Sequence, residues 1–170
     1  MIIHLVDGTY ELFRHFYGLR RFTKGKDRPY GAVVGVLQTV LQMIDSVKGS
    51  ASRGPSEAYL GVATDHVIES FRNRLWADYK TGAGIEPALL AQFHPLEEAL
   101  AAMGVVVWPM IELEADDALA SAAHLASKKR GKGVTAYFRH KLLIVSSDPH
   151  IHPCSSRVFG SNSITEKIES

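Results

Sequence analysis

Short apolar runs alternate along this chain with longer segments in which apolar residues recur every three or four positions. The runs are typical of buried β-strands, and the longer segments are typical of amphipathic helices. The strands predicted in this way are Ile2–Val6, Ala58–Ala63, Val105–Trp108 and Leu142–Val145. The predicted helices are Tyr10–Tyr17, Val33–Val47, Val67–Tyr79, Pro87–Met103 and Glu112–Ser127.

This alternation predicts an α/β fold, in which a mostly parallel central sheet is covered by helices on both faces to give three layers. With 170 residues, the chain is long enough for one domain with its own hydrophobic core. We assign residues 1–148 to this domain. Residues 149–170 contain two prolines and several serines without a clear periodicity, so we expect a divergent or poorly ordered tail there.

Acidic residues follow the end of every predicted strand. Because the carboxyl ends of parallel strands meet at one edge of a sheet, these acids are expected to converge there. Converging carboxylates repel one another unless cations neutralise them, and oxygen ligands favour Mg²⁺ or Mn²⁺. Two such ions about 4 Å apart can hold the attacking and leaving oxygens of a phosphodiester. The candidate metal ligands are Asp7, Asp65, Glu114, Asp116, Asp117 and Asp148.

Each of these acids also has a simpler interpretation when it is taken alone. Asp7 and Gly8 could form a turn, and the acids that begin at Glu114 could be favoured by a helix N-terminus. A succession of four strand ends that all carry acids is harder to explain in this way. The pattern as a whole therefore favours a metal site.

The net charge of +1 conceals two separate basic groups. This separation from the acids suits a protein that holds phosphates with one surface and metal ions with another. The alternative is a solvent-exposed loop and a helix C-terminus, where cations are favoured in any protein. The first group is Arg20, Arg21, Lys24, Lys26 and Arg28, and the second is Lys128, Lys129, Arg130, Lys132, Arg139 and Lys141.

Composition places the chain among ordinary globular proteins, with 46% apolar and 22% charged residues. No apolar run approaches the ~20 residues that span a bilayer. The first residues have no basic segment before the apolar one, which argues against a signal peptide. A single cysteine, Cys154, fits a reducing compartment. We therefore expect a cytoplasmic protein.

Several short motifs follow one another along the chain. They are Val6-Asp7-Gly8-Thr9-Tyr10-Glu11-Leu12-Phe13-Arg14, Tyr30-Gly31, Asp65, Ser70-Phe71-Arg72, Tyr79-Lys80 and Glu114-Ala115-Asp116-Asp117. In order and spacing, these motifs resemble those of the 5′→3′ exonuclease and flap-endonuclease family, which includes the 5′-nuclease domain attached to bacterial DNA polymerase I. The resemblance covers residues 2–148, and the last of these motifs is its most specific part.

The resemblance implies a PIN-like fold and the hydrolysis of DNA or RNA–DNA strands from 5′ ends or at flaps, with two divalent ions. The acids that match the family's metal ligands are Asp7, Asp65, Glu114, Asp116 and Asp117. Arg72 and Lys80 match its catalytic basic residues beside the scissile phosphate, where positive charge stabilises developing negative charge. They could otherwise be surface charges. The expected DNA-binding residues are Arg14, Arg20, Arg21, Lys24, Lys26 and Arg28.

The segment Phe71–Phe93 corresponds to the family's arch, through which a single strand threads. Aromatic side chains in such a segment can stack on bases. Trp76 is one of these aromatics, and it could equally belong to the core.

Two departures from the family pattern concern the end of the chain. The family has Asp-Lys-Asp where this chain has Asp148-Pro149-His150, so only the first acid is kept. The sequence also stops before the family's helix–turn–helix module. A truncated or frame-shifted gene product, with impaired activity, would explain both departures. Sequencing of the locus tests this hypothesis, because an intact downstream frame encoding Asp-Lys-Asp would support it and the lack of one would contradict it.

The residues suggest three other functions besides a 5′-nuclease. A phosphatase of the haloacid dehalogenase type is excluded, because its nucleophilic aspartate would have to stand where this chain has Leu5. A PIN-domain ribonuclease shares the fold and the acids. A nucleic-acid-binding remnant without catalysis would keep only the basic groups. The last two remain open at the level of the sequence.

Overall fold

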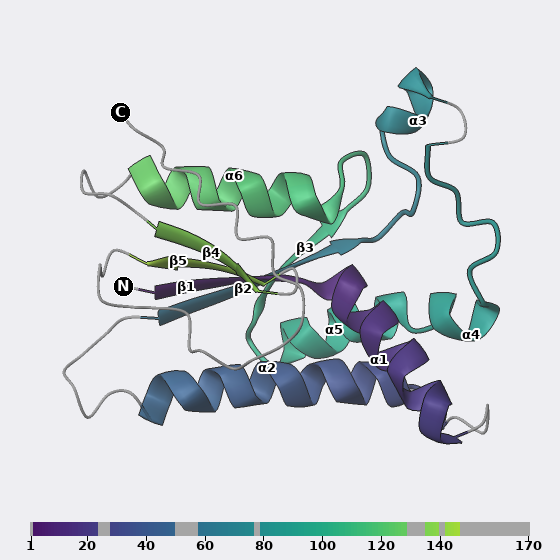
Figure 1. The fold of residues 1–170 in the computed structure, drawn as a ribbon, viewed down its shortest axis with the longest axis horizontal. Helices are drawn as coiled ribbons and strands as arrows, with labels where there is room; N and C mark the ends of the chain where they lie inside the picture. The colour runs from purple at the N-terminus through teal and green to yellow at the C-terminus, as the bar shows by residue number, and fades with distance from the viewer. Residues whose placement is uncertain are drawn as a thin grey trace.

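The computed structural model of this protein describes residues 2–23, 28–49, 58–76, 79–128, 135–139 and 142–146. These residues form a five-stranded sheet in the order β3-β2-β1-β5-β4 (Figure 1). The strands are β1 (Ile2–Asp7), β2 (Ala58–Asp65), β3 (Val106–Met110), β4 (Thr135–Arg139) and β5 (Leu142–Ser146).

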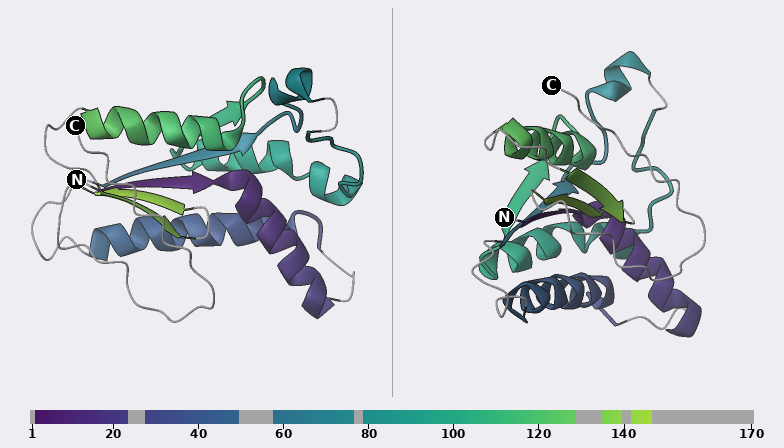
Figure 2. Two further views of the ribbon diagram at one scale, coloured as in Figure 1. Left: turned by 45° about the horizontal axis from the view of Figure 1, so that its top comes forward. Right: turned by 60° about the vertical axis from the view of Figure 1, so that its left-hand side comes forward.

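Helices cover both faces of this sheet. Helix α6 lies on one face, and α2 and α5 lie on the other, so the sheet is the middle of three layers (Figure 2). The α/β class predicted from the sequence is thereby confirmed. The helices are α1 (Gly8–Thr23), α2 (Gly31–Gly49), α3 (Arg72–Leu75), α4 (Pro87–Leu90), α5 (Phe93–Ala102) and α6 (Ala115–Lys128).

Strands β1, β2 and β3 form the parallel part of the sheet. Asp7 lies opposite Ala63, and Asp65 lies opposite Met110, so the carboxyl ends of β1 and β2 are close together. Helix α1 leaves this edge directly after Asp7. A Cβ on Gly8 would lie 2.8 Å from side-chain carbons of both Val62 and Thr64, so only glycine lets α1 begin this close to β2.

The core has two parts, one on each face of the sheet. Because side chains alternate along a strand, Val6 and Leu5 of β1 point to opposite faces. Val6 joins the larger cluster with residues of α1, α2 and α5, whereas Leu5 joins a smaller cluster with Ala115 and Leu119 of α6. The larger cluster fixes α5 against the sheet, and the smaller one fixes the first turn of α6 near the ends of β1 and β2.

The other half of the sheet differs from the prediction. Strand β5 runs antiparallel to β1, with Leu142 opposite Val6 and Ser146 opposite Ile2. The expectation that the fourth predicted strand ends at the same edge as β1 and β2 is therefore wrong. Strand β4, which pairs antiparallel with β5, was not predicted at all. A hairpin of this kind puts the end of β5 at the opposite end of β1 from Asp7.

The helix predicted over Val67–Tyr79 is also wrong, because only the single turn α3 is helical. The backbone N–H groups of Val67 and Phe71 donate to the carbonyls of Met110 and Glu112, which lie in a different segment. Two of its large apolar side chains do not pack into the core, since Leu75 and Trp76 are both 64% exposed. This segment is a loop held to the β3–α6 connection, and Trp76 is not a core residue.

The helix predicted over Pro87–Met103 is divided into α4 and α5 by a turn at Ala91 and Gln92. Pro95 explains the break, because a proline ring clashes with the carbonyl four residues earlier and is tolerated only in the first turn of a helix. The Gln92 side chain then has a role of its own. Its Oε1 accepts hydrogen bonds from the N–H groups of Ala32 and Val33 at 3.1 and 3.2 Å, which joins this turn to the start of α2.

Candidate metal centre

Two buried carboxylates stand at the ends of neighbouring parallel strands. Asp7 is 3% exposed and Asp65 is 5% exposed. Asp7 Oδ1 accepts a hydrogen bond from the N–H of Tyr10 at 2.8 Å, so this side chain caps the start of α1. Asp65 Oδ1 accepts one from the N–H of Ala115 at 2.8 Å, and the Asp65 N–H donates to the Thr9 hydroxyl at 2.7 Å. Both carboxylates are thus held in place by backbone contacts.

The first turn of α6 and the residue before it supply three more acids. Glu114 precedes the helix, and its N–H donates to Asp117 Oδ2 at 2.9 Å, as in a capping box. The Ser70 hydroxyl donates to Glu114 Oε1 at 2.7 Å. Negative charge is favoured at this end of a helix by the helix dipole. The same contacts therefore start the helix and orient its acids.

These elements enclose a cleft of about 330 Å³. Four of the six predicted metal ligands line it, and we call it the carboxylate cleft. Asp117 faces Arg72 and does not line the cleft, and Asp148 lies outside the described residues. The residues that line the carboxylate cleft are Asp7, Asp65, Tyr79, Lys80, Glu114, Ala115 and Asp116.

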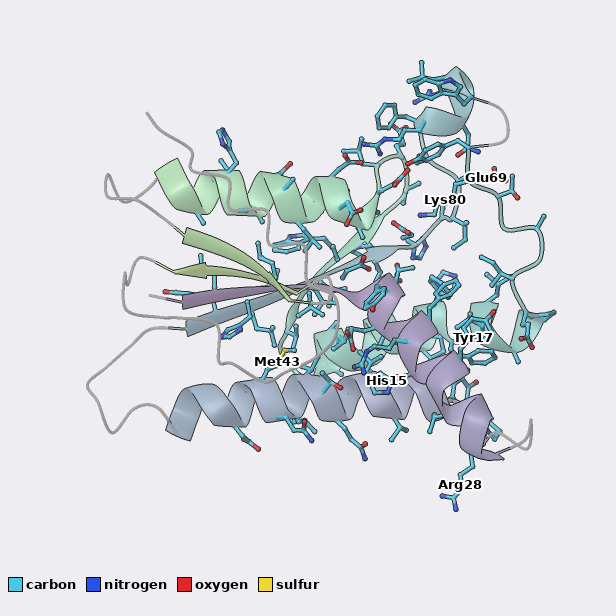
Figure 3. All side chains as sticks on the ribbon, viewed as in Figure 1. His15, Tyr17, Arg28, Met43, Glu69 and Lys80 are labelled. Atoms are coloured by element: carbon cyan, nitrogen blue, oxygen red, sulfur yellow. The ribbon has the colours of Figure 1, made fainter. Side chains whose placement is uncertain are left out.

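Lys80 is the cation of the carboxylate cleft. Its Nζ lies 2.5 Å from Asp65 Oδ2. The loop around Lys80 is held by Asn73, whose Nδ2 donates to the Lys80 carbonyl at 2.6 Å while its Oδ1 accepts from the Ser70 N–H at 3.0 Å. The ammonium group is therefore aimed into the cleft by a loop, as Figure 3 shows for Lys80 at the ends of the strands.

Arg72 forms a bidentate ion pair with Asp117 beside the carboxylate cleft. Its guanidinium donates to both oxygens of Asp117 at 2.8 and 2.7 Å, and Nη1 lies 3.3 Å from Glu114 Oε1. The guanidinium carbon is 4.7 Å from the centre of the Phe71 ring. The hydrogen bonds from Arg72 lower the pKa of Asp117 below its ordinary value, and those same bonds raise the pKa of Arg72.

The sequence did not indicate the groups that position this site. Thr9 and Ser70 belong to the quoted motifs, but their hydroxyls carried no predicted role. Asn73 lies within the predicted helix Val67–Tyr79. Its spacing of three residues from Ser70 is the one feature of the sequence that indicates a turn here. Tyr79 also lines the cleft and was not proposed as a site residue.

A second group of metal-ligating side chains lies close by, and the sequence analysis missed it. His66, His94 and Glu97 place one ligand atom each within 4.8 Å of one another, and we call them the histidine cluster. His94 and Glu97 are three residues apart on α5, which is the one signal that could have indicated them. Glu97 also accepts a hydrogen bond from the buried Thr64 hydroxyl at 2.6 Å.

The predicted DNA-binding residues lie along and beyond α1. Arg14 is paired with Glu11 on the same helix. Arg20 and Arg21 are in the last part of α1, while Lys24 and Lys26 lie outside the described residues. Arg28 is exposed beyond the end of α1, and Figure 3 shows it well away from Lys80. Of these residues, Arg28 is thus the one that the structure places away from Lys80.

A family model described as 5′-3′ exonuclease, N-terminal resolvase-like domain, matches residues 2–162. The chain belongs to this family. The 5′-3′ exonucleases are metal-dependent nucleases that act on nucleic acid, and the match confirms the resemblance drawn from the motifs. None of the described helices is long and apolar enough to span a membrane.

The relatives with the most informative names come from three bacteria. A 5′-3′ exonuclease of Buchnera aphidicola is 29% identical over 86% of this chain and 46% of its own length. A 5′-3′ exonuclease of Aquifex aeolicus is 28% identical over 98% of this chain and 56% of its own length. DNA polymerase I of Pseudomonas aeruginosa is 32% identical over 70% of this chain and 12% of its own length. No solved structure is similar enough to count as a match.

The chain thus spans about half the length of the free-standing exonucleases that it matches. What those whole proteins do is therefore a proposal for this chain.

Proposed function

We propose that this chain carries the active site of a magnesium-dependent 5′→3′ exonuclease that hydrolyses phosphodiester bonds of DNA. The observation that supports this most is the gathering of four carboxylates around one cleft at the ends of β1 and β2. Membership of the 5′-3′ exonuclease family supports the reaction class. The proposed substrates are 5′ ends, flaps or single strands, and the proposed compartment is the cytoplasm.

The donor set fits a hard cation. Every metal-ligating side chain that lines the carboxylate cleft is an aspartate or a glutamate, and such oxygen donors favour Mg²⁺ or Mn²⁺ over zinc. We expect Asp7, Asp65, Glu114 and Asp116 to hold the first ion. Asp117 is the ligand proposed for a second ion. Asp148 is left out, because β5 runs antiparallel to β1 and ends with Ser146 opposite Ile2, at the other end of β1 from Asp7. A bound ion would supply Lewis-acid stabilisation and a water of lowered pKa.

Lys80 and Arg72 are the proposed catalytic cations. A divalent ion held by Asp65 would compete with the Lys80 ammonium for the same carboxylate oxygen. The ammonium, which lines the cleft, would then be free to contact a phosphate. The planar guanidinium of Arg72 can donate two parallel hydrogen bonds to a phosphate as well as to a carboxylate. Positive charge at this position stabilises the negative charge that develops on the phosphoryl oxygens.

The basic residues of α1 and the following loop are proposed to bind the DNA backbone. Contacts of this kind carry no sequence information, and they weaken as salt concentration rises. The DNA-binding residues proposed in this way are Arg14, Arg20, Arg21, Lys24, Lys26 and Arg28.

A cleavage assay tests the proposal. The purified chain is incubated with 5′-labelled flap DNA, 5′-recessed duplex and single-stranded RNA, each with and without Mg²⁺ or Mn²⁺. We expect metal-dependent cleavage of DNA from the 5′ end that is lost in Asp116→Ala. Asp45→Ala is the matched control, because Asp45 is an exposed aspartate of α2 outside the cleft.

The other outcomes separate the remaining functions. Cleavage of RNA alone would favour a PIN-type ribonuclease. Binding of DNA with no cleavage in either metal would favour a nucleic-acid-binding remnant. Equal cleavage by Asp116→Ala and the unaltered chain would contradict the assignment of the carboxylate cleft as the active site.

A further inference from the structure

The carboxylate cleft and the histidine cluster contain two consecutive residues, Asp65 and His66, whose side chains face different parts of the fold. Asp65 contacts Lys80 and the first turn of α6. The side chain of His66 instead contacts Oε2 of Glu97 on α5. The hydroxyl of Thr64 donates to the other carboxylate oxygen of Glu97. The alternation of side chains along β2 accounts for this division. The two groups of ligands are therefore separate, with α5 providing most of the histidine cluster.

Glu97 is oriented as the centre of the histidine cluster. Its side chain is buried, and its two oxygens have different partners. Oε1 accepts the Thr64 hydroxyl at 2.6 Å, whereas Oε2 lies 2.7 Å from Nδ1 of His66 and 3.9 Å from Nδ1 of His94. One oxygen is thus held by a supporting hydrogen bond, and the other faces two imidazole nitrogens. Supporting hydrogen bonds of this kind orient metal-ligating carboxylates.

The ion-pair partners of Glu97 also differ from those of the acids in and beside the carboxylate cleft. Asp65 is paired with Lys80, and Asp117 is paired with Arg72. Within the described part of the chain, the ion pairs of Glu97 are with the two histidines, and no lysine or arginine reaches it. A buried carboxylate is costly without a compensating cation. A bound divalent ion would provide that charge.

The histidine cluster has the size and the freedom to close around an ion. Donors at about 2.0–2.2 Å from a tetrahedral metal are about 3.4 Å apart. The three donors now lie within 4.8 Å of one another, so small shifts bring them to this spacing. Glu97 Oε2 and His66 Nδ1, which are 2.7 Å apart, would have to separate, and Glu97 Oε2 and His94 Nδ1, which are 3.9 Å apart, would have to approach. His94 can move, because its side chain is 64% exposed. The two rings already meet edge to face, with centres 4.4 Å apart.

We propose that His66, His94 and Glu97 bind one transition-metal dication of the zinc class, at a site separate from the carboxylate cleft. Two imidazoles and one carboxylate select Zn²⁺, Co²⁺ or Ni²⁺ and disfavour Mg²⁺. Three protein ligands leave a fourth position for water. The bound ion joins the carboxyl end of β2 to α5, and it stabilises the folded chain as its concentration rises above the dissociation constant. The proposal does not depend on the nuclease activity.

Metal titration of the chain tests this site directly. The chain is prepared without a histidine tag, freed of metal with EDTA, and titrated with Co²⁺ and Zn²⁺. The readouts are the visible absorption of bound Co²⁺, the heat of Zn²⁺ binding and the rise in Tm. The titrations contain excess Mg²⁺, which occupies the carboxylate cleft. We expect one equivalent of Zn²⁺ to bind under these conditions, and we expect His94→Ala to weaken binding at least about tenfold. His94 is exposed enough for this variant to fold, and an unchanged Tm without metal checks that it does.

Two variants provide controls. His124→Ala removes an exposed histidine of α6, and Asp116→Asn disables the carboxylate cleft. Both should bind Zn²⁺ as the unaltered chain does. The proposal is overturned if the unaltered chain binds no Zn²⁺, if His94→Ala binds it equally well, or if Asp116→Asn is the variant that loses it.

Discussion

The carboxylate cleft and the histidine cluster are built around neighbouring residues of one strand, yet they present opposite chemistry. The cleft collects carboxylates from three elements and neutralises them with Lys80 and Arg72. The cluster surrounds one buried carboxylate, Glu97, with two imidazoles and a hydroxyl. The alternation of side chains along a single strand thus separates a cleft lined by carboxylates from a cluster that contains two imidazoles.

The largest expected effect is at Asp7, where one side chain both caps a helix and lines the carboxylate cleft. Asn caps a helix about as well as Asp, so Asp7→Asn should keep the hydrogen bond from the Tyr10 N–H. It removes the charge that a metal ion needs. We expect metal-dependent cleavage to fall at least about 100-fold while Tm stays unchanged, as measured by single-turnover cleavage and thermal unfolding.

Asp7→Ala is the companion variant, because it removes both roles and should also destabilise the fold by about 1 kcal/mol. Zinc binding at the histidine cluster should survive both changes. A loss of zinc binding in Asp7→Asn would mean that the two sites are not separate.

The next largest effect is expected at Lys80, where one substitution should lower kcat but raise the affinity for Mg²⁺. Lys80→Met removes the proposed phosphate contact, so kcat should fall about 100-fold. It also removes the ammonium that competes with metal ions at Asp65 Oδ2, so the affinity for Mg²⁺ should rise. Metal titration of the cleavage rate measures both. Arg74→Met, which removes an exposed cation of α3, is the control. A lower Mg²⁺ affinity in Lys80→Met would show that Lys80 does not compete with the ion.

A smaller effect is expected at Thr64, which supports the histidine cluster alone. Thr64→Val keeps the shape of this buried side chain but removes the donor to Glu97 Oε1. We expect a loss of about 1–2 kcal/mol in the free energy of unfolding and about tenfold weaker zinc binding. Urea unfolding and zinc titration measure these quantities. Thr39→Val on α2 should change stability without changing zinc binding, and cleavage should stay at its original rate in Thr64→Val.

The smallest effect concerns the pH dependence of the Arg72–Asp117 pair. Arg72 lowers the pKa of Asp117 below its ordinary value of 3.8. A lowered pKa in the folded state means that the pair contributes stability fully above pH 3.8, and that this contribution is lost as pH falls through the folded-state pKa. In Arg72→Gln the pKa of Asp117 should rise toward 3.8, as measured by carboxyl NMR. The stability difference from the unaltered chain should shrink at low pH, and a constant difference would contradict this account.

Much of the carboxylate cleft could be predicted because its acids directly follow strands. Asp7 and Asp65 end short apolar runs, and a parallel pairing brings such ends together without further information. Glu114 and Asp116 begin a helix that packs over the same strands. In each of these cases, local periodicity and position in the chain contain the necessary information.

The remaining errors have physical causes that a single sequence does not display. The direction of β5 depends on which strand it pairs with, and its apolar run is the same in either direction. The loop that contains Arg72 and Asn73 has helix-forming residues, but its backbone bonds are made to a distant segment. His66 and Glu97 are 31 residues apart, so their contact depends on how α5 packs against β2.

The bonds that hold Asp65 have a consequence for the order of folding. Its N–H reaches Thr9 across 56 residues, and its carboxylate reaches the Ala115 N–H across 50. Contacts between residues so far apart in the chain require large loops to close before they form. The acids therefore come together only where the sheet and α6 have assembled. We expect their mutual repulsion to oppose that assembly, and Lys80 and Arg72 to offset it.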